Sequence, residues 1–88
     1  MEIQYKKQYV AVDVHYTAEG KVDPKQIYWP DGRVFLIDAV VGVENAASLK
    51  VGGAGIRYRV LIPGEDDSYQ RELWFVDNKW FVEIKRQA

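Results

Sequence analysis

The chain has 88 residues, of which 48% are hydrophobic and 28% charged, and its formal net charge is −1. This length predicts one domain, residues 1–88, with a core of limited size. The near-neutral charge provides no overall field that would draw the protein onto nucleic acid or an anionic membrane. Cysteine is absent, which excludes disulfides and thiolate chemistry. No apolar run approaches the roughly 20 residues that span a bilayer. The N-terminus does not resemble a signal peptide, so we expect a soluble, cytoplasmic protein.

The first third of the chain predicts a strand, a turn and a second short strand. Hydrophobic and polar side chains alternate over residues 9–16, which is the period of a half-buried strand. A turn follows, in which Gly20 is free to take a positive φ. Pro24 cannot donate a hydrogen bond to a strand ladder, so we expect residues 22–25 to be an edge or a connector. Residues 26–29 then form a short β-like run.

The middle of the chain combines its most apolar segment with its only candidate for a helix. Residues 30–32 read Pro-Asp-Gly, which is a strong turn signal. Residues 33–43 place apolar side chains on both strand faces, which predicts a central strand buried on both sides. Near residues 45–50 we expect at most one short helical turn, capped by Asn45. Residues 52–55 are rich in glycine and predict a flexible connection.

The last third predicts three strands joined by short turns. Residues 56–62 alternate between the two faces of a strand, with residues 63–68 as an acidic turn after it. Residues 69–76 form the next strand, residues 77–79 a tight hairpin turn, and residues 80–86 the closing strand. The side chains of residues 56–62 that are expected to face inward are Ile56, Tyr58, Val60 and Ile62. In the closing strand, Trp80, Val82 and Ile84 share one face, and Phe81, Glu83 and Lys85 share the other.

Together these segments predict a mainly β fold. Short strands with a turn signal about every ten residues are typical of a meander or a small barrel. We therefore expect about six antiparallel strands that close into a small, SH3-like barrel, because closure buries one face and removes vulnerable edges.

No motif in the chain demands a particular chemistry. His15 is the only histidine, and one histidine cannot make a multi-histidine metal site. A general base formed by His15 with Asp13 or Asp38 is conceivable, but such pairs are common by chance. Consecutive acids at 65–67 lack the alternate spacing of a calcium loop, and the glycines at 52–55 lack the order of a phosphate loop. We expect no catalytic residue, no cofactor and no metal, and hence no enzyme.

A binding surface is the remaining candidate. Arginine beside exposed aromatic rings is the composition of a platform for single-stranded nucleic acid, on which bases stack and guanidinium groups meet phosphates. The alternative is that these arginines pair with Glu72 or other acids across the strands, and that Trp74 and Trp80 belong to the core. The candidate surface comprises Arg57, Arg59, Arg71, Tyr69 and Trp29.

Several stretches of the chain also resemble a known group of sequences. They are residues 20–38, 47–50, 52–53, 56–58, 73–75 and 79–83. Together they resemble a family of short, uncharacterised bacterial proteins, mainly from Gram-positive anaerobes, over most of the chain. The resemblance implies a bacterial, cytoplasmic, single-domain protein, and it implies no activity, ligand or site residue.

The sequence therefore favours a small interaction or accessory module that binds a protein partner or associates with itself. We expect its contacts at the edge near Pro24 and at the loop of residues 52–55. The alternative is a barrel that binds single-stranded nucleic acid through the arginine and aromatic surface. No membrane contact and no small-molecule ligand are expected.

Overall fold

The computed structural model describes residues 3–47 and 54–87, and these residues form seven strands with no helix. The prediction of a mainly β fold is confirmed, although with one strand more than expected. The strands are β1 (Ile3–Tyr16), β2 (Val22–Tyr28), β3 (Val34–Leu36), β4 (Ala39–Ala47), β5 (Ala54–Pro63), β6 (Ser68–Val76) and β7 (Lys79–Gln87).

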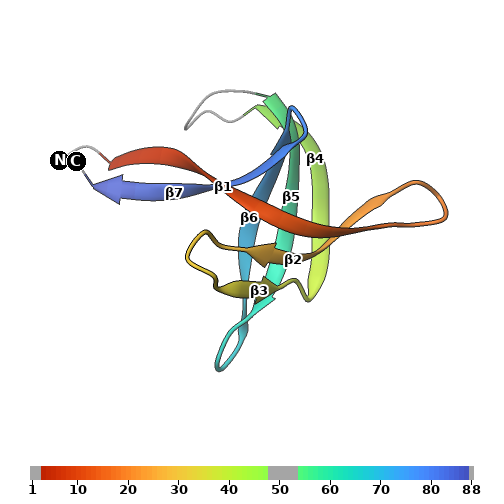
Figure 1. Ribbon diagram of the computed structural model, residues 1–88, viewed down its shortest axis with the longest axis horizontal. Helices are drawn as coiled ribbons and strands as arrows, with labels where there is room; N and C mark the ends of the chain where they lie inside the picture. The colour runs from red at the N-terminus through yellow and green to blue at the C-terminus, as the bar shows by residue number, and fades with distance from the viewer. Residues whose placement is uncertain (1–2, 48–53, 88) are drawn as a thin grey trace.

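All seven strands belong to one antiparallel sheet of order β3-β2-β1-β7-β6-β5-β4 (Figure 1). The sheet curls into a half-barrel, so that its two ends approach each other. Two backbone hydrogen bonds fasten the ends at one point, because the N–H of Ile37 donates to the carbonyl of Lys25 and the N–H of Asp38 donates to that of Leu61. Beyond this point the half-barrel has an open seam.

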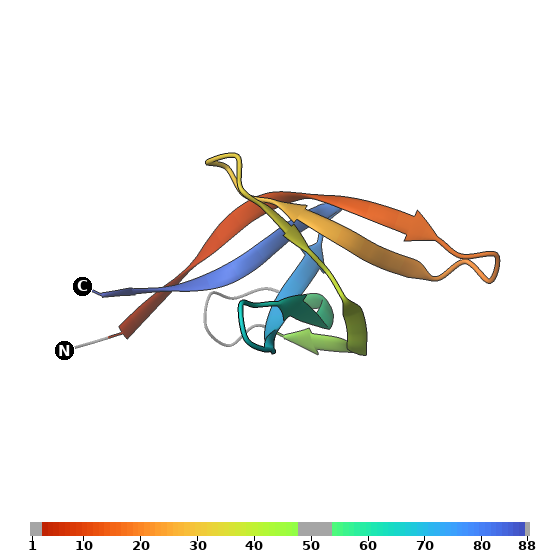
Figure 2. The ribbon, with the colours of Figure 1, turned by 90° about the horizontal axis from the view of Figure 1, so that it is seen from below.

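The long strand β1 pairs with two different strands along its length. Residues 3–10 pair with β7 and residues 11–16 pair with β2. In Figure 2, β1 and β2 lie in the upper layer, with β4 and β5 in the lower one. The twist of a β-strand allows such a change of partners, and the register with β2 then shifts by one residue between Asp13 and Val14.

The inner face of the curled sheet holds the main core. The inward side of β5 is the predicted one, since Tyr58, Val60 and Ile62 are buried and the arginines between them point outward. The fully buried members of this core are Ile27, Tyr58, Val60, Ile62, Leu73 and Val82.

The outer face carries a second, smaller cluster of rings. Phe81 faces outward from β7, as its alternation predicts, yet it is only 1% exposed. Its ring stacks on that of Trp74, and the edge of Tyr9 meets it from β1. The outer face of the sheet therefore also buries large side chains where β6 and β7 pair.

The prediction of one central strand over residues 33–43 is wrong. This segment forms two strands, β3 and β4, and they are the two edges of the sheet. The break falls at Ile37 and Asp38, where the chain leaves β2 for β5. Large apolar side chains of both strands are exposed rather than buried, since Leu36 is 57% exposed and Val43 is 55% exposed.

The predicted helical turn is also wrong where it can be compared. Asn45, Ala46 and Ala47 pair with β5 as part of β4. Alanine favours helices only weakly, and the ladder with β5 overrides that preference. Residues 48–50 lie outside the described residues, as do residues 52 and 53 of the predicted glycine connection at 52–55. The rest of that connection, Ala54 and Gly55, belongs to β5, so the prediction is wrong there.

Pro24 lies within β2 and is not in a connector. It pairs with Val14 next to the bulge at which the register with β1 shifts, and its side chain is buried. β3 pairs only with residues 26–28 of β2, so the stretch around Pro24 does have a free edge. Proline is tolerated at such positions because no ladder bond is lost.

The predicted turns are confirmed. Gly20 has φ 84° and Gly32 has φ 97°, a region that glycine enters without steric cost. Asp77 and Asn78 both have positive φ and form the two-residue hairpin between β6 and β7.

Candidate functional site

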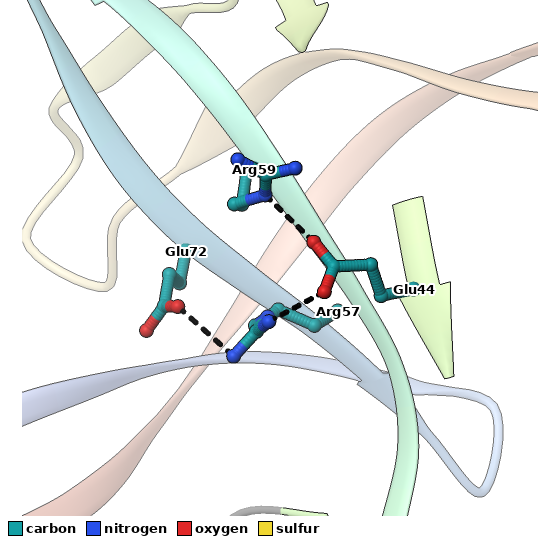
Figure 3. A network of polar contacts seen from close by, with 4 residues as sticks. All are labelled: Glu44, Arg57, Arg59 and Glu72. Carbon is teal, nitrogen blue, oxygen red and sulfur yellow. Dashed lines mark hydrogen bonds and ion pairs between the residues drawn. The ribbon is translucent and has the colours of Figure 1, made fainter. Parts of the chain in front are cut away.

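Arg57 and Arg59 lie on the outer face of β5, where two carboxylates meet them (Figure 3). Arg57 donates a hydrogen bond of 2.8 Å to Glu44 on β4, and its other terminal nitrogen lies 3.4 Å from Glu72 on β6. Arg59 Nε lies 2.8 Å from the second oxygen of Glu44, in an ion pair that lacks hydrogen-bond alignment. The four side chains form one network.

This network belongs to a row of side chains that crosses five strands. The Arg57 guanidinium lies 5.9 Å from the centroid of the Trp74 ring, which stacks on Phe81. Cross-strand partners interact in this way because their Cβ atoms are neighbours on one face of the sheet. From β1 to β4, the row reads Tyr9, Phe81, Trp74, Arg57 and Glu44.

The network is electrically balanced, with two guanidinium groups and two carboxylates. The hydrogen bond from Arg57 is the main cause that lowers the pKa of Glu44, and Arg59 adds to it. Glu44 is therefore ionised at neutral pH and cancels much of the positive field of this face. Of the alternatives that the sequence leaves open, pairing of these arginines with acids across the strands is the one present here.

Arg71 lies on the opposite face of the sheet from Arg57 and Arg59. It pairs with Val60, whose side chain is in the inner core, whereas Arg59 pairs with Glu72. The five residues of the candidate surface are thus divided between two faces. Three of them, Trp29, Tyr69 and Arg71, line one pocket on the inner side.

This pocket, here called the ring pocket, has a volume of about 100 Å³. It lies between the β2–β3 and β5–β6 hairpins. The Arg33 guanidinium lies 5.8 Å from the ring centroid of Trp29 and 5.6 Å from that of Phe35. The residues that line the ring pocket are Ile27, Trp29, Arg33, Phe35, Ile62, Tyr69 and Arg71.

The two arginines of the ring pocket differ in their partners. Arg33 Nε lies 2.7 Å from Asp31 Oδ2, and the backbone N–H of Arg33 donates to Asp31 as well. That backbone hydrogen bond is the main cause that lowers the pKa of Asp31. Arg71 has no hydrogen bond or ion pair with any residue in the described part of the chain.

Sequence reasoning missed Arg33 and Phe35 as site residues. A local signal did exist, because the predicted Pro-Asp-Gly turn brings Trp29 and Arg33 face to face. The Trp29 N–H donates to the Arg33 carbonyl across that turn at 2.8 Å. Tyr69 and Arg71 come from another hairpin, and only the curl of the sheet brings them to this pair.

The open seam forms a second, larger hollow, here called the seam groove, of about 600 Å³. On one side are the β1–β2 turn and the free edge of β2, and on the other is β4. Its floor includes Tyr58, whose ring packs 5.2 Å from that of Trp80. The lining residues are Thr17, Gly20, Lys21, Val22, Asp23, Val40, Val43 and Tyr58.

The remaining candidates from the sequence lie apart from both hollows. His15 is exposed on β1, and Asp13 accepts a 2.6 Å hydrogen bond from the Tyr28 hydroxyl, which raises the pKa of Tyr28. The acids at 65–67 are exposed in the β5–β6 turn. Over residues 3–47 and 54–87, no three acidic or histidine side chains are grouped so as to hold a metal, and no helix could cross a membrane.

The resemblance to short bacterial proteins stays a prediction. Comparisons with protein-family models, curated proteins and solved structures find no match to this chain.

Proposed function

We propose that the protein is a non-catalytic interaction module that binds an extended polypeptide segment at its open seam. The observation that carries this proposal is the seam groove between the free edges of β2 and β4. Its volume of about 600 Å³ lies within the usual range of ligand clefts. An added strand would pair with an edge through main-chain hydrogen bonds and place alternate side chains in the groove.

Beyond a bulge between Val40 and Gly42, the edge of β4 lacks the protections that natural edge strands carry. Edges are commonly kept from pairing by shortness, proline or lysine. β3 has only three residues, and the free edge of β2 carries Pro24 and Lys25. β4 has nine residues without proline or lysine, and its single charge, on Glu44, is turned toward Arg57 and Arg59. Pairing with another strand is the natural use of such an edge.

The groove also offers apolar contacts for the side chains of an added strand. Val43 faces the groove from β4 and is 55% exposed, so a ligand could cover it. Val22 and Val40 add apolar side chains to the walls of the seam groove. Burial raises the pKa of Tyr58, so its hydroxyl stays protonated at neutral pH and can donate a hydrogen bond.

The test begins with a displayed library of random heptapeptides, selected on the folded protein. Selected peptides are titrated into ¹⁵N-labelled protein, and amide shifts and hydrogen exchange are recorded. We expect shifts at Val22, Val43 and Tyr58 and slowed exchange along β4. Val43→Lys should weaken binding at least tenfold, which corresponds to about 1.4 kcal/mol. Val34→Lys is the matched control, since Val34 is 49% exposed on the other edge strand.

The same variants distinguish a foreign segment from a second copy of this chain. Sedimentation velocity over a range of concentrations reports self-association. A dimer that Val43→Lys abolishes would identify the added strand as the partner's β4. The proposal would be refuted by peptides that change neither the amide shifts nor the hydrogen exchange of β4, or that bind Val43→Lys as tightly as the parent.

A second candidate function is the binding of single-stranded nucleic acid. The observation that favours it is the meeting of Trp29, Tyr69 and Arg71 in the ring pocket. Arg57 and Arg59 are neutralised by ion pairs, which argues against a longer row of free cations that could follow the phosphates of a strand. Titration with a mixed oligonucleotide should shift ring-pocket amides and weaken steeply with salt if this function is correct. If the oligonucleotide does not shift the ring-pocket amide signals even at low salt, this second function is rejected.

A further inference from the structure

The ring pocket contains one cation with no partner in the described part of the chain. The guanidinium of Arg33 is held by Asp31 and by two aromatic rings, so its position is defined within the β2–β3 hairpin. Arg71, on β6, lines the same pocket without an ion pair among the described residues. A partly buried guanidinium without an ion pair favours an anion, and a carboxylate matches its planar fork.

The remaining walls of the ring pocket are apolar and sized for one small group. Ile27 and Ile62 are 1% and 2% exposed and form its base, and Phe35 lies beside them. A dry cavity of about 150 Å³ is known to hold one benzene ring, so 100 Å³ suits a ring or a branched aliphatic group that enters in part. Tyr69, at 40% exposure, offers a free face at the rim.

We propose that the ring pocket binds a carboxylate attached to an apolar group, with the carboxylate on Arg71 and the apolar group against Phe35 and Ile62. The ligand has two possible sources with the same chemistry. One is a free aromatic or branched acid, and the other is the C-terminal residue of a polypeptide. This site is separate from the seam groove, since the two hollows share no lining residue.

The geometry favours such an acid over a nucleic-acid strand. A strand needs a series of cations that follow its phosphates and several exposed rings for successive bases. Here Arg33 is already engaged by Asp31, and Arg57 and Arg59 on the outer face are engaged by Glu44 and Glu72. One uncommitted guanidinium beside a pocket for one ring suits a single charge on a single apolar group.

The experiment is an NMR titration of the ¹⁵N-labelled full chain with phenylacetate, phenylacetamide and acetate. We expect phenylacetate to shift the Trp29 indole N–H and the amides of Tyr69 and Arg71 in a saturable way. Phenylacetamide lacks the charge and acetate lacks the ring, so each should bind at least tenfold more weakly. Arg71→Gln should weaken phenylacetate binding at least tenfold. Lys6→Gln removes one exposed positive charge on β1 and should change nothing.

Four results would overturn this proposal. They are shifts outside the ring pocket, equal binding of phenylacetate and phenylacetamide, equal binding of acetate, and an Arg71→Gln variant that binds like the parent. An oligonucleotide that shifts the same signals while phenylacetate does not would assign the pocket to nucleic acid instead. Val43→Lys, the variant for the seam groove, should leave phenylacetate binding unchanged, which keeps the two proposals separable.

A last comparison identifies the source of the ligand. Acetyl-Ala-Phe carries the same ring and a free C-terminal carboxylate, and its amidated form lacks the charge. If the free peptide binds tenfold more tightly than phenylacetate and its amidated form does not bind, the ligand is a polypeptide C-terminus. Equal affinity of the peptide and phenylacetate would indicate that only the acid and its ring are recognised. Either result supports a carboxylate site.

Discussion

The rings of Trp74 and Phe81 lie parallel on neighbouring strands, with 4° between their planes and 6.1 Å between their centroids. They are 2% and 1% exposed although they lie on the outer face of the sheet. A one-sided sheet would leave this face to polar residues. The stacked pair therefore gives the half-barrel a second apolar contact, beneath the guanidinium of Arg57.

Truncation of this pair should destabilise the protein strongly. Phe81→Ala removes a fully buried ring, and we expect it to lower the free energy of unfolding by about 3–5 kcal/mol. Urea denaturation followed by tryptophan fluorescence measures this change. Tyr16→Ala is the control, because Tyr16 is 70% exposed and its loss should change stability by about 0.5 kcal/mol or less. Equal effects of the two variants would contradict the outer cluster.

Gly42 makes room for the Arg59 side chain. A Cβ atom at Gly42 would collide with the guanidinium of Arg59, which lies across this glycine on the neighbouring strand. Gly42→Ala should therefore push Arg59 away from Glu44 and let the pKa of Glu44 rise toward its ordinary value. NMR titration of the Glu44 side-chain carboxyl measures this shift. An unchanged pKa would mean that Arg59 keeps its ion pair.

The charge network should make stability depend on acid pH. The folded-state pKa of Glu44 lies below its ordinary value, so its contribution is present above about pH 4.3 and is lost as pH falls through the folded pKa. Urea unfolding at pH 6 and pH 3 should show a smaller loss for Glu44→Gln than for the parent. Glu19→Gln, exposed in the β1–β2 turn, should follow the parent. Identical pH profiles for all three proteins would contradict the role of Glu44.

Backbone conformation alone should decide the effect of changes at Gly32. Its φ is 97°, and a Cβ there would meet no atom within 4 Å. Gly32→Ala should lower stability by about 1–2 kcal/mol, because L-residues other than Asn and Asp avoid positive φ. Gly32→Asn should lose less. Thermal denaturation compares the two, and a melting temperature for Gly32→Ala equal to that of the parent would show that the turn relaxes.

Local patterns predicted the strands and turns well where they depend on neighbouring residues. The alternation around Tyr58 and Val60 predicts the buried side of β5, and Asp77-Asn78 predicts the β6–β7 hairpin. The same logic misread residues 33–43, whose apolar side chains suggested a buried central strand. Whether Val43 is buried depends on which strand lies beyond β4, and that partner is not a local property of the sequence.

The candidate site was predictable only in part for a similar reason. Trp29, Tyr69 and Arg71 do meet in the ring pocket, but Arg57 and Arg59 lie on the other face. The alternation that separates Arg71 from Arg59 depends on the register between β5 and β6. A shift of one residue in that register would have put all three arginines on one face.

The position of β1 in the sheet also constrains how the chain can be made. Val10 pairs with Trp80, which follows it by 70 residues, and synthesis at about 5–20 residues per second separates the two by about 4–14 s. During that interval the edge of β1 that later pairs with β7 has no partner strand. Unpaired strand edges are prone to aggregate, so β1 is exposed to this hazard until β7 has been made and can pair with it.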